Sequence, residues 1–455
     1  MSPEVFVLPA SLTQRRLWLL DRLNPGSAEY NIVWSVRLTG PLRPDALEAA
    51  LGWLVARHEA LRTSIVAVDG EPAQRVVPAS PVRLPVTDLT DLPEQERQRR
   101  AIELVDEVGA EPFDLAEGPL LRLRLVRLTA EEHVLALVVH HIVADGWSFD
   151  IVFAELGQAY QAAVAGGVPD LPPPEIQYGD FAIWQRERAD QDGFAEELDF
   201  WRAQLADAPT LLDLPADRPR PAEQSPAGDL VQFRVPARLA DGVRSLARSV
   251  DGSEFAVLLA AFQCLLYRLT GQSDLLVGVP VAGRTRPETR GVVGFFANTL
   301  ALRARFDDDV TFAETLAAAR ESTRATQTHQ DVPFEQLVEA LCSERSLAYS
   351  PLVQVMFALE EAPAPVRVAG VEFVPELREN GSVKFDLTLT VQRRTDGLAG
   401  RITYRTDLYD AERIEALAAQ YLALLEAAIA APDTPVAELP LLDTAQRQAL
   451  TQRWR

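Results

Sequence analysis

The segment HVLALVV, residues 133–139, constrains the fold more than any other part of the sequence. After His133 its residues are apolar at consecutive positions, so both faces of an extended strand would be apolar there. Such a strand is typical of a sheet that other elements cover on both sides. Two histidines, His140 and His141, follow it, and residues 149–164 then show helical periodicity. The sequence therefore predicts a covered strand, a loop and a helix, centred on the histidine pair.

Helices and strands alternate along the N-terminal half. Residues 43–66 are predicted to begin as a helix, with Asp45 and Glu48 as a capping pair and apolar residues at helical spacing. The segment ends in β-branched residues, which favour a strand. Residues 119–128 alternate apolar residues with arginine, which predicts a half-buried strand. Proline and glycine are concentrated in residues 166–187, which we expect to form the crossover between two halves.

The second half mixes buried helices with strands, and it ends in a segment, 435–450, that looks like an interdomain linker. We therefore expect the chain to be one piece of a longer protein. Helices are expected at 254–267, 311–327 and 411–429, and strands at 274–284, 352–360, 384–392 and 398–406.

Composition excludes several classes of function. A chain of 455 residues suggests two or three domains. The net charge of −22 argues against a nucleic-acid partner, because phosphate binding needs a dense basic face. The longest apolar run, 255–267, is too short to span a bilayer, and the first residues do not resemble a signal peptide. We expect a cytoplasmic protein with no membrane partner. Metal and nucleotide motifs are absent from the sequence.

The histidine pair carries the chemistry that the residues themselves suggest. Side chains alternate along a strand, so His140 and His141 face opposite sides. A partly buried imidazole is the commonest general base in proteins. Asp145 is expected to orient the ring or pair with an arginine, while Gly146 admits a close backbone approach and amide donors for an oxyanion. No nucleophile elbow surrounds Ser148, so the pattern favours direct attack of one substrate on another.

Two other interpretations of the pair stand beside this one. Histidines at the end of a strand can be purely structural, with the aspartate in a salt bridge. They can also bind zinc, although adjacent histidines rarely point at the same ion and no other ligand cluster lies nearby in the sequence.

The segment HHIVADG, residues 140–146, resembles the HHxxxDG signature of the condensation domains of non-ribosomal peptide synthetases, a group related to chloramphenicol acetyltransferase. Further blocks resemble that family in its order, and together they cover essentially the whole chain. These blocks are SLTQRRLWLLDRLNPGSAEYNI (11–32), RHEALRT (57–63), YGDFAIWQ (178–185), VGFFANTLALR (293–303), HQDVPFEQLVE (329–339), RSLAYSPLVQVMF (345–357, a looser match) and GSVKFDLTL (381–389).

The resemblance implies an α/β sandwich fold with two chloramphenicol acetyltransferase-like lobes, which form a V-shaped pseudo-dimer around a central tunnel. The N-terminal lobe would take residues 1–175 with the signature, and the C-terminal lobe residues 176–455. Upstream donor and downstream acceptor peptidyl carrier proteins would present their substrates on 4′-phosphopantetheine arms, and the domain itself would have no covalently bound cofactor and no metal. An adenylation domain is expected after the C-terminus, and the domain is expected to be a monomer.

The resemblance also implies roles for the residues of the signature. His141 would lie in the tunnel, as the general base for the acceptor amine or as the group that positions it. His140 would support the loop. Asp145 would form a structural salt bridge, with Arg284 as the first candidate partner and Arg16 as the second.

Four further residues are expected near the substrates. The backbone amide of Gly146 would contact the thioester carbonyl or its oxyanion. Trp147, Asn298 and Ser382 fall in blocks that approach the tunnel and are predicted to bind substrate, although for a tryptophan core packing is the more frequent role.

The function that the resemblance implies is formation of an amide bond between a carrier-bound acyl or peptidyl thioester and the α-amino group of a carrier-bound aminoacyl thioester. The alternatives within the same fold are an epimerisation domain, a starter N-acylation domain and a non-catalytic recruitment domain. A free-standing acyltransferase that acylates a soluble amine or alcohol is a further alternative.

Overall fold

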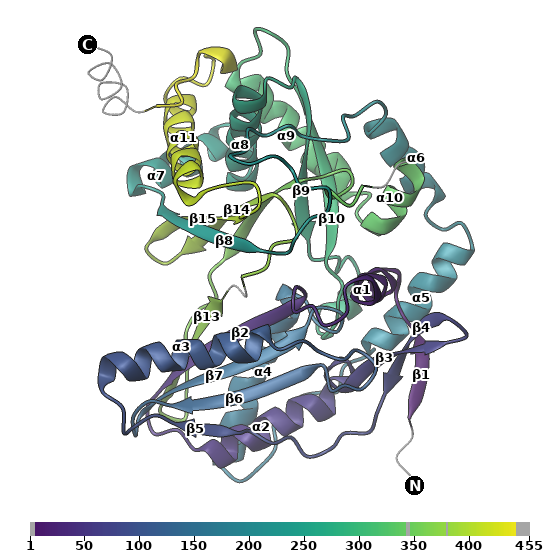
Figure 1. The fold of residues 1–455 in the computed structure, drawn as a ribbon, viewed down its shortest axis with the longest axis vertical. Helices are drawn as coiled ribbons and strands as arrows, with labels where there is room; N and C mark the ends of the chain where they lie inside the picture. Colours follow the sequence, from purple (N-terminus) through teal and green to yellow (C-terminus); the bar gives the residue numbers. More distant parts are fainter. Residues whose placement is uncertain (1–4, 343–345, 379–380, 443–455) are drawn as a thin grey trace. The chain divides into compact units, whose positions relative to one another are not determined.

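The computed structural model describes residues 5–342, 346–378 and 381–442 (Figure 1). It is a mixed α/β structure, which confirms the predicted fold class. The chain forms two compact units that are interleaved in sequence. The first unit takes Met1–Phe194, Ala282–Ala297 and Pro363–Asn380, and the second takes Ala195–Val281, Asn298–Ala362 and Gly381–Arg455.

The chain passes from the first unit to the second between Phe194 and Ala195, which is later than the segment 166–187 expected for the crossover. It then returns to the first unit twice. One boundary between the lobes, after residue 175, is predicted from the sequence, whereas each unit is built from three segments of the chain. The boundary at residue 175 remains a prediction.

The sheet of the first unit has the strand order β12-β13-β2-β7-β6-β5. β7 (Glu132–His140) lies inside this sheet and pairs antiparallel with both of its neighbours. Every residue from His133 to His140 is buried, which confirms the prediction of a covered strand. The other strands are β12 (Val366–Val368), β13 (Val371–Arg378), β2 (Asn31–Thr39), β6 (Leu121–Arg127) and β5 (Val86–Asp88).

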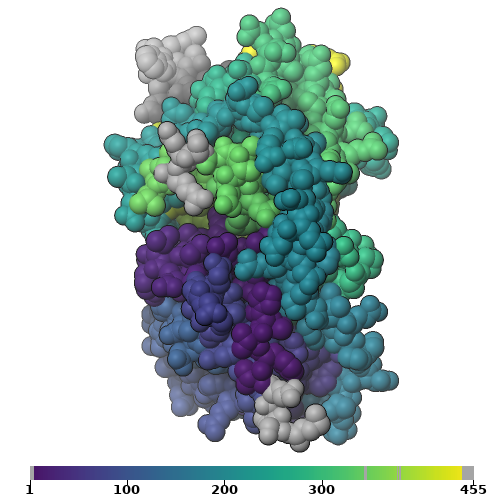
Figure 2. All heavy atoms as spheres, turned by 90° about the vertical axis from the view of Figure 1, so that its right-hand side faces the viewer, coloured from purple at the N-terminus to yellow at the C-terminus, as the bar shows by residue number. Residues whose placement is uncertain are grey.

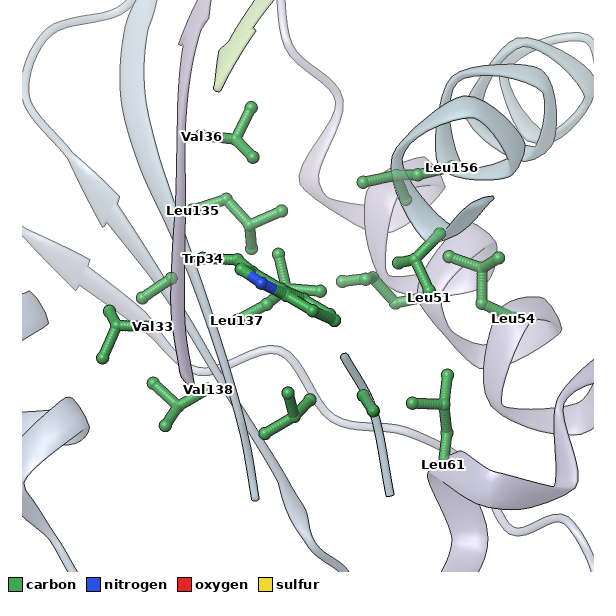
Figure 3. Packing of buried hydrophobic residues seen from close by; sticks show 14 of the residues in the cluster. Val33, Trp34, Val36, Leu51, Leu54, Leu61, Leu135, Leu137, Val138 and Leu156 are labelled. Carbon is green, nitrogen blue, oxygen red and sulfur yellow. The ribbon is translucent and has the colours of Figure 1, made fainter. Parts of the chain in front are cut away.

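Helices cover both faces of this sheet. Figure 3 shows Trp34 of β2 and Leu137 of β7 pointing toward Leu51 of α2 (Pro44–Arg57), while Val33 and Val138 point the other way. The alternation of a strand thus places successive apolar residues in two separate layers.

The second of these layers is formed with α3 (Glu94–Ala110), which contacts β2, β6 and β7. Gly109 of α3 lies so close to the sheet that a Cβ there would be 2.6 Å from Cγ2 of Val33. On the opposite face, α2 packs along α4 (Gly146–Val164).

The start of α2 differs from the sequence prediction. Pro44 occupies the first helical position and Arg43 the N-cap, and no side chain caps the helix. Asp45 therefore lies inside the helix, where it pairs with Arg43 at 2.6 Å, and Glu48 accepts a hydrogen bond from the Leu84 amide at 2.7 Å. The predicted capping pair was wrong because the helix begins at the proline, which places the N-cap two positions before Asp45.

A three-stranded sheet with the order β1-β4-β3 completes the first unit, together with α1 and α5. Figure 2 shows one face of the molecule, where the purple N-terminal residues lie beside teal α5, in agreement with the contacts of α5 with β1 and α1. The elements are β1 (Phe6–Pro9), β4 (Glu71–Val76), β3 (Thr63–Val68), α1 (Leu12–Leu23), α5 (Tyr178–Asp190) and the 3-10 turns η1 (Glu59–Arg62) and η2 (Pro287–Thr289).

The sheet of the second unit has the order β10-β9-β11-β14-β15-β8. Its central helix, α8 (Glu254–Thr270), contacts α7, α9 and α11 and is buried from Ala256 to Leu266. The predicted helices and strands of this half are confirmed to within a few residues. The elements are β10 (Asn298–Arg305), β9 (Asp274–Val281), β11 (Val355–Glu361), β14 (Leu387–Arg394), β15 (Gly397–Arg405), β8 (Gly228–Arg234), α6 (Ala195–Gln204), α7 (Ala237–Ser249), α9 (Phe312–Gln327), α10 (Phe334–Leu341), α11 (Ala411–Ala430) and η3 (Val436–Glu438).

The first part of the predicted linker, 435–450, packs on the second unit. Val436 and Leu439 are buried, and Arg268 donates hydrogen bonds to both of their carbonyls at 2.8 and 2.6 Å. The linker prediction was wrong for these residues because two apolar side chains close together in the sequence reach the core. Its last residues, 443–450, lie outside the described part of the chain.

Across the described residues, no single helix has the length and apolar character needed to cross a membrane. The pair α7 and α8 meets the criterion together on length and composition alone, with a bend of 108° between the two helices.

Candidate active site

The histidine pair lies where β7 ends and α4 begins, in the predicted order of strand, loop and helix. His140 is the last residue of β7, and Gly146 is the first residue of α4. Between them the backbone forms a tight turn, in which the amide of Val143 donates to the carbonyl of His140 at 3.1 Å. The amide of His141 donates to the carbonyl of Tyr30 at 2.8 Å, which ties the start of the turn to the neighbouring β2 region.

The two imidazoles have different surroundings and opposite tautomers. Nδ1 of buried His140 accepts a hydrogen bond from the amide of Ile142 at 3.1 Å, so its proton is on Nε2. Nδ1 of half-buried His141 lies 2.9 Å from the carbonyl oxygen of Ala144. A carbonyl only accepts, so Nδ1 of His141 carries the proton and the lone pair of its neutral ring is on Nε2. His140 thus binds a backbone amide of the turn through Nδ1, whereas the basic nitrogen of a neutral His141 is Nε2.

An aromatic ring from a distant part of the sequence lies against His141. Phe295 belongs to the segment Ala282–Ala297, which leaves β9 and returns to β10 but packs in the first unit. The centroids of the Phe295 and His141 rings are 4.5 Å apart and their planes are tilted by 57°. Sequence reasoning missed this contact because it joins positions that are far apart in the chain.

Asp145 connects the turn to that segment. Its Oδ1 accepts from the amide of Ser148 at 2.8 Å, from the hydroxyl of Ser148 at 2.7 Å and from Nη2 of Arg284 at 3.1 Å. Its Oδ2 accepts from the amides of Phe296 at 3.0 Å and Ala297 at 3.2 Å. The carboxylate is the N-cap of α4 and is almost completely buried. These donors join the turn to the Ala282–Ala297 segment, and none of them is the imidazole of His141.

Of the two candidate partners for Asp145, Arg284 lies at the carboxylate. Its side chain is 2% exposed, and Nη1 also donates to the carbonyls of Thr289 and Val292, each at 2.6 Å. Burial lowers the pKa of Arg284, and the charge of Asp145 opposes that shift. The guanidinium therefore remains protonated at neutral pH. Arg16, the second candidate, is half-buried in α1.

The close approach of the Ala282–Ala297 segment requires glycine at one position. Gly283 has a φ of +63°, which is unfavourable for other residues. A Cβ there would lie 2.0 Å from the carbonyl oxygen of Phe296, so the backbone itself fills the space of a side chain.

Ser148 is a second residue whose role the sequence analysis missed. Its hydroxyl accepts from the amide of Gly294 at 3.1 Å and lies 2.9 Å from the carbonyl of the same residue. Because Ser148 is 0% exposed and its oxygen is surrounded by protein groups, it is not placed to act as a nucleophile. The signal in the sequence was the spacing of Asp145 and Ser148, which form a capping box at the start of α4.

Gly146 and Trp147 form the exposed first turn of α4. Trp147 is 42% exposed, and its Nε1 donates to the carbonyl of Arg290 at 3.0 Å. Core packing was therefore the wrong interpretation for this tryptophan. At Gly146, no heavy atom lies within 4 Å of the position that a Cβ would take.

The remaining predicted substrate residues, Asn298 and Ser382, belong to the second unit. The side-chain amide of Asn298 donates to the carbonyls of Gln330 and Val332 at 2.9 and 2.7 Å, and its oxygen accepts from the amide of Phe334 at 2.9 Å. Asn298 thus fixes the backbone of residues 330–334, which belong to the HQDVPFEQLVE block. Ser382 is half-buried, and its backbone forms an isolated antiparallel bridge with Ala227.

A surface pocket of about 650 Å³ lies elsewhere on the first unit. It is lined by Pro9, Arg15, Glu71, Ile183, Arg186, Glu187 and Asp190. Charges of both signs border it, and none of the predicted site residues does. Within the described ranges, no three His, Cys, Asp or Glu side chains come together in a way that could hold a metal ion.

Comparison with known proteins shows which class this fold and site define. The family described as "Condensation domain" matches residues 6–451, so the chain belongs to the condensation domains of non-ribosomal peptide synthetases. Domains of this family transfer acyl groups and form peptide bonds. The recognition of the family from the sequence is confirmed.

Two relatives illustrate the match. The chain is 43% identical over 450 residues to one of the linear gramicidin synthase proteins of Brevibacillus parabrevis, covering 98% of this chain and 6% of that protein. It is 42% identical over 453 residues to phosphinothricin tripeptide synthetase PhsB of Streptomyces viridochromogenes, covering 98% of this chain and 38% of that protein. The chain thus spans well under two thirds of the length of these multidomain synthetases.

Among solved structures, the X-domain from teicoplanin biosynthesis superposes with a TM-score of 0.86 at 30% identity, covering 95% of this chain and 97% of that one. SgcC5 from Streptomyces globisporus superposes with a TM-score of 0.80 at 33% identity, covering 94% of this chain and all of that one.

Proposed function

We propose that this condensation domain joins a carrier-bound acyl or peptidyl thioester to the α-amino group of a carrier-bound aminoacyl thioester. In this proposal, His141 is the general base that accepts the proton of the amine. The observation that carries the proposal is the contact of His141 Nδ1 with the Ala144 carbonyl, at 2.9 Å. That contact puts the lone pair of the neutral ring on Nε2, the form that a general base requires.

In the proposed reaction the amine nitrogen attacks the thioester carbonyl carbon. The C–N bond forms while the carbonyl electron pair moves to the oxygen, and the C–S bond then breaks with departure of the thiolate. Nε2 of His141 takes the proton that the amine loses and returns it to the sulfur. The amides at the start of α4, beginning with Gly146, are oriented out of the helix end and support the oxyanion.

No covalent acyl-enzyme belongs to this proposal. Ser148, the hydroxyl nearest to the pair in sequence, is fully buried and hydrogen-bonded to Asp145. Both substrates are tethered, so their proximity supplies much of the rate and one base is sufficient.

The partners follow from the same proposal. An upstream donor and a downstream acceptor peptidyl carrier protein present the two thioesters on 4′-phosphopantetheine arms, which are part of the substrates rather than a resident cofactor. The relatives are multidomain synthetases, which supports carriers and an adenylation domain in the same assembly. We further propose a monomeric domain that works in the cytoplasm, with Trp147, Asn298 and Ser382 near the substrates.

The test of the function is a reconstituted reaction with a loaded donor carrier and a loaded acceptor carrier, followed by mass spectrometry of both. Condensation gives a longer amide-linked chain on the acceptor carrier and an empty donor carrier. An epimerisation domain changes only the configuration at Cα of one carrier-bound residue, and a recruitment domain leaves both carriers as they were. Either of these two results contradicts the proposal.

Replacing Gly146 with alanine tests the oxyanion contact. Nothing lies within 4 Å of the added Cβ, so the melting temperature of Gly146→Ala should stay at or slightly above that of the wild type. Condensation should fall roughly tenfold or more, because the methyl group keeps the thioester carbonyl from its closest approach to the amide.

The matched control for this prediction is Gly52→Ala in α2, where an added Cβ also meets nothing within 4 Å. The control should keep the wild-type rate. A Gly146→Ala domain that condenses at the wild-type rate would show that the substrate does not approach this amide.

A further inference from the structure

Tyr178, the first residue of α5, links the N-terminal block of the chain to the segment that carries Phe295. It is 1% exposed, and its hydroxyl oxygen lies 2.7 Å from the carbonyl of Phe295 and 2.8 Å from the hydroxyl of Ser11. Burial raises the pKa of Tyr178, so the phenol keeps its proton. A carbonyl only accepts, so Tyr178 donates to Phe295 and accepts from Ser11.

The ring of Tyr178 also packs on both neighbours of Phe295. It contacts Phe296 edge to face, with centroids 5.0 Å apart and planes at 88°. Gly294 passes beneath it so closely that a Cβ at this residue would lie 2.1 Å from Cδ2 of Tyr178. The tyrosine thus touches three consecutive residues, and its hydroxyl holds the carbonyl of the middle one.

On the side facing the turn, the same three residues meet the histidine loop. The Phe295 ring, in a residue that is 9% exposed, is the one that lies 4.5 Å from the ring of His141. Asp145 holds the amides that follow, at Phe296 and Ala297. A contact path therefore runs from the hydroxyl of Tyr178 through the Phe295 backbone and ring to the imidazole, within the first unit.

We infer that Tyr178 is a positioning residue for condensation: by holding the Phe295 carbonyl it keeps the Phe295 ring against His141 and fixes the orientation of the imidazole. The inference rests on the proposed role of His141. Tyr178 touches neither substrate nor imidazole in this assignment, and it acts only through Phe295.

The physical consequence is a loss of ring order when the hydroxyl is removed. In Tyr178→Phe, the buried carbonyl of Phe295 loses its donor, and the segment relaxes toward another partner. The Phe295 ring then allows more than one orientation of His141, and a smaller fraction of domains presents Nε2 to the amine. A displacement of about 1 Å in a catalytic group is enough to cost tenfold or more in rate.

The experiment compares Tyr178→Phe with Tyr421→Phe in the reconstituted condensation reaction. Tyr421 is also fully buried, and its hydroxyl donates to the Leu258 carbonyl at 3.0 Å in the second unit, so the chemical change is the same. We expect kcat of Tyr178→Phe to fall about tenfold, with the KM for the acceptor carrier unchanged. We also expect its pH–rate profile to shift and the ring signals of His141 in the nitrogen NMR spectrum to change. Tyr421→Phe should lose a similar amount of thermal stability but keep the wild-type rate and profile.

The possible results separate this inference from the proposed function. Wild-type kcat and an unchanged His141 spectrum in Tyr178→Phe, together with an inactive His141→Ala, overturn the inference and leave the function standing. An active His141→Ala overturns the role of the histidine and, with it, the positioning role. Should Tyr178→Phe not fold, Phe295→Leu, which keeps the backbone contact and removes only the ring, must show the same loss of kcat at unchanged KM, and wild-type kcat would reject the inference.

Discussion

Replacing His141 with alanine is expected to lower the condensation rate by about 10²- to 10⁴-fold, the usual contribution of a positioned general base. The fold should survive, because the side chain is half-buried and the hydrogen bond we see for it goes from Nδ1 to the Ala144 carbonyl. The rate is measured by mass spectrometry of the acceptor carrier, and the fold by the melting temperature. An active His141→Ala domain would contradict the assignment.

The control for this prediction is the neighbouring histidine. In His140→Asn, the side-chain oxygen of asparagine takes the place of Nδ1 and can still accept from the Ile142 amide, so the turn is kept. This variant should retain most of the activity. A rate as low as that of His141→Ala would show that both imidazoles take part in the chemistry.

A second substitution at His141 separates its two possible roles. Glutamine can hydrogen-bond to an amine but cannot remove its proton. If His141 only positions the amine, His141→Gln should recover a large part of the rate that alanine loses. If His141 is the base, glutamine and alanine should be equally inactive. The contact of Nδ1 with the Ala144 carbonyl leaves an acceptor on Nε2 in either role, so the rate of His141→Gln decides between them.

Features that depend on local pattern could be predicted from the sequence. The covered strand β7 follows from apolar residues at consecutive positions, and α8 from a long apolar helical run. The unequal roles of the two histidines follow from strand alternation, which the opposite hydrogen bonds of His140 and His141 match. These inferences need only neighbours within a few residues.

Features that depend on distant contacts could not be predicted in the same way. Phe295 reaches His141, and Tyr178 reaches the Phe295 carbonyl, because the Ala282–Ala297 segment packs in the first unit, and no local periodicity encodes that path. Arg284 was predicted only as one candidate of two, since pairing it with Asp145 requires the same path. The exposure of Trp147 was missed because a large apolar side chain normally predicts burial.

Replacing Asp145 with alanine is expected to cost about 3–5 kcal/mol of unfolding free energy, the usual result of removing one partner of a buried ion pair. The change leaves the 2% exposed guanidinium of Arg284 without a counter-charge and takes acceptors from the amides of Phe296 and Ala297. It also removes the N-cap of α4, near Ser148. Urea denaturation followed by tryptophan fluorescence measures the loss.

Two further variants test whether the lost stability comes from the unpaired charge of the buried Arg284 guanidinium. Asp45→Ala breaks an exposed pair with Arg43 in the same unit and should leave the denaturation midpoint essentially unchanged. Asp145→Ala combined with Arg284→Met should be more stable than Asp145→Ala alone, because no unpaired charge is then buried. A double variant no more stable than the single one would mean that the carboxylate acts mainly through the backbone amides. Asp145→Ala should also lose activity, because the contacts of Asp145 tie the loop that carries His141 to Arg284, Phe296 and Ala297. Asp145→Ala and His141→Ala should therefore both lower the condensation rate, but only Asp145→Ala should lower the denaturation midpoint by a large amount.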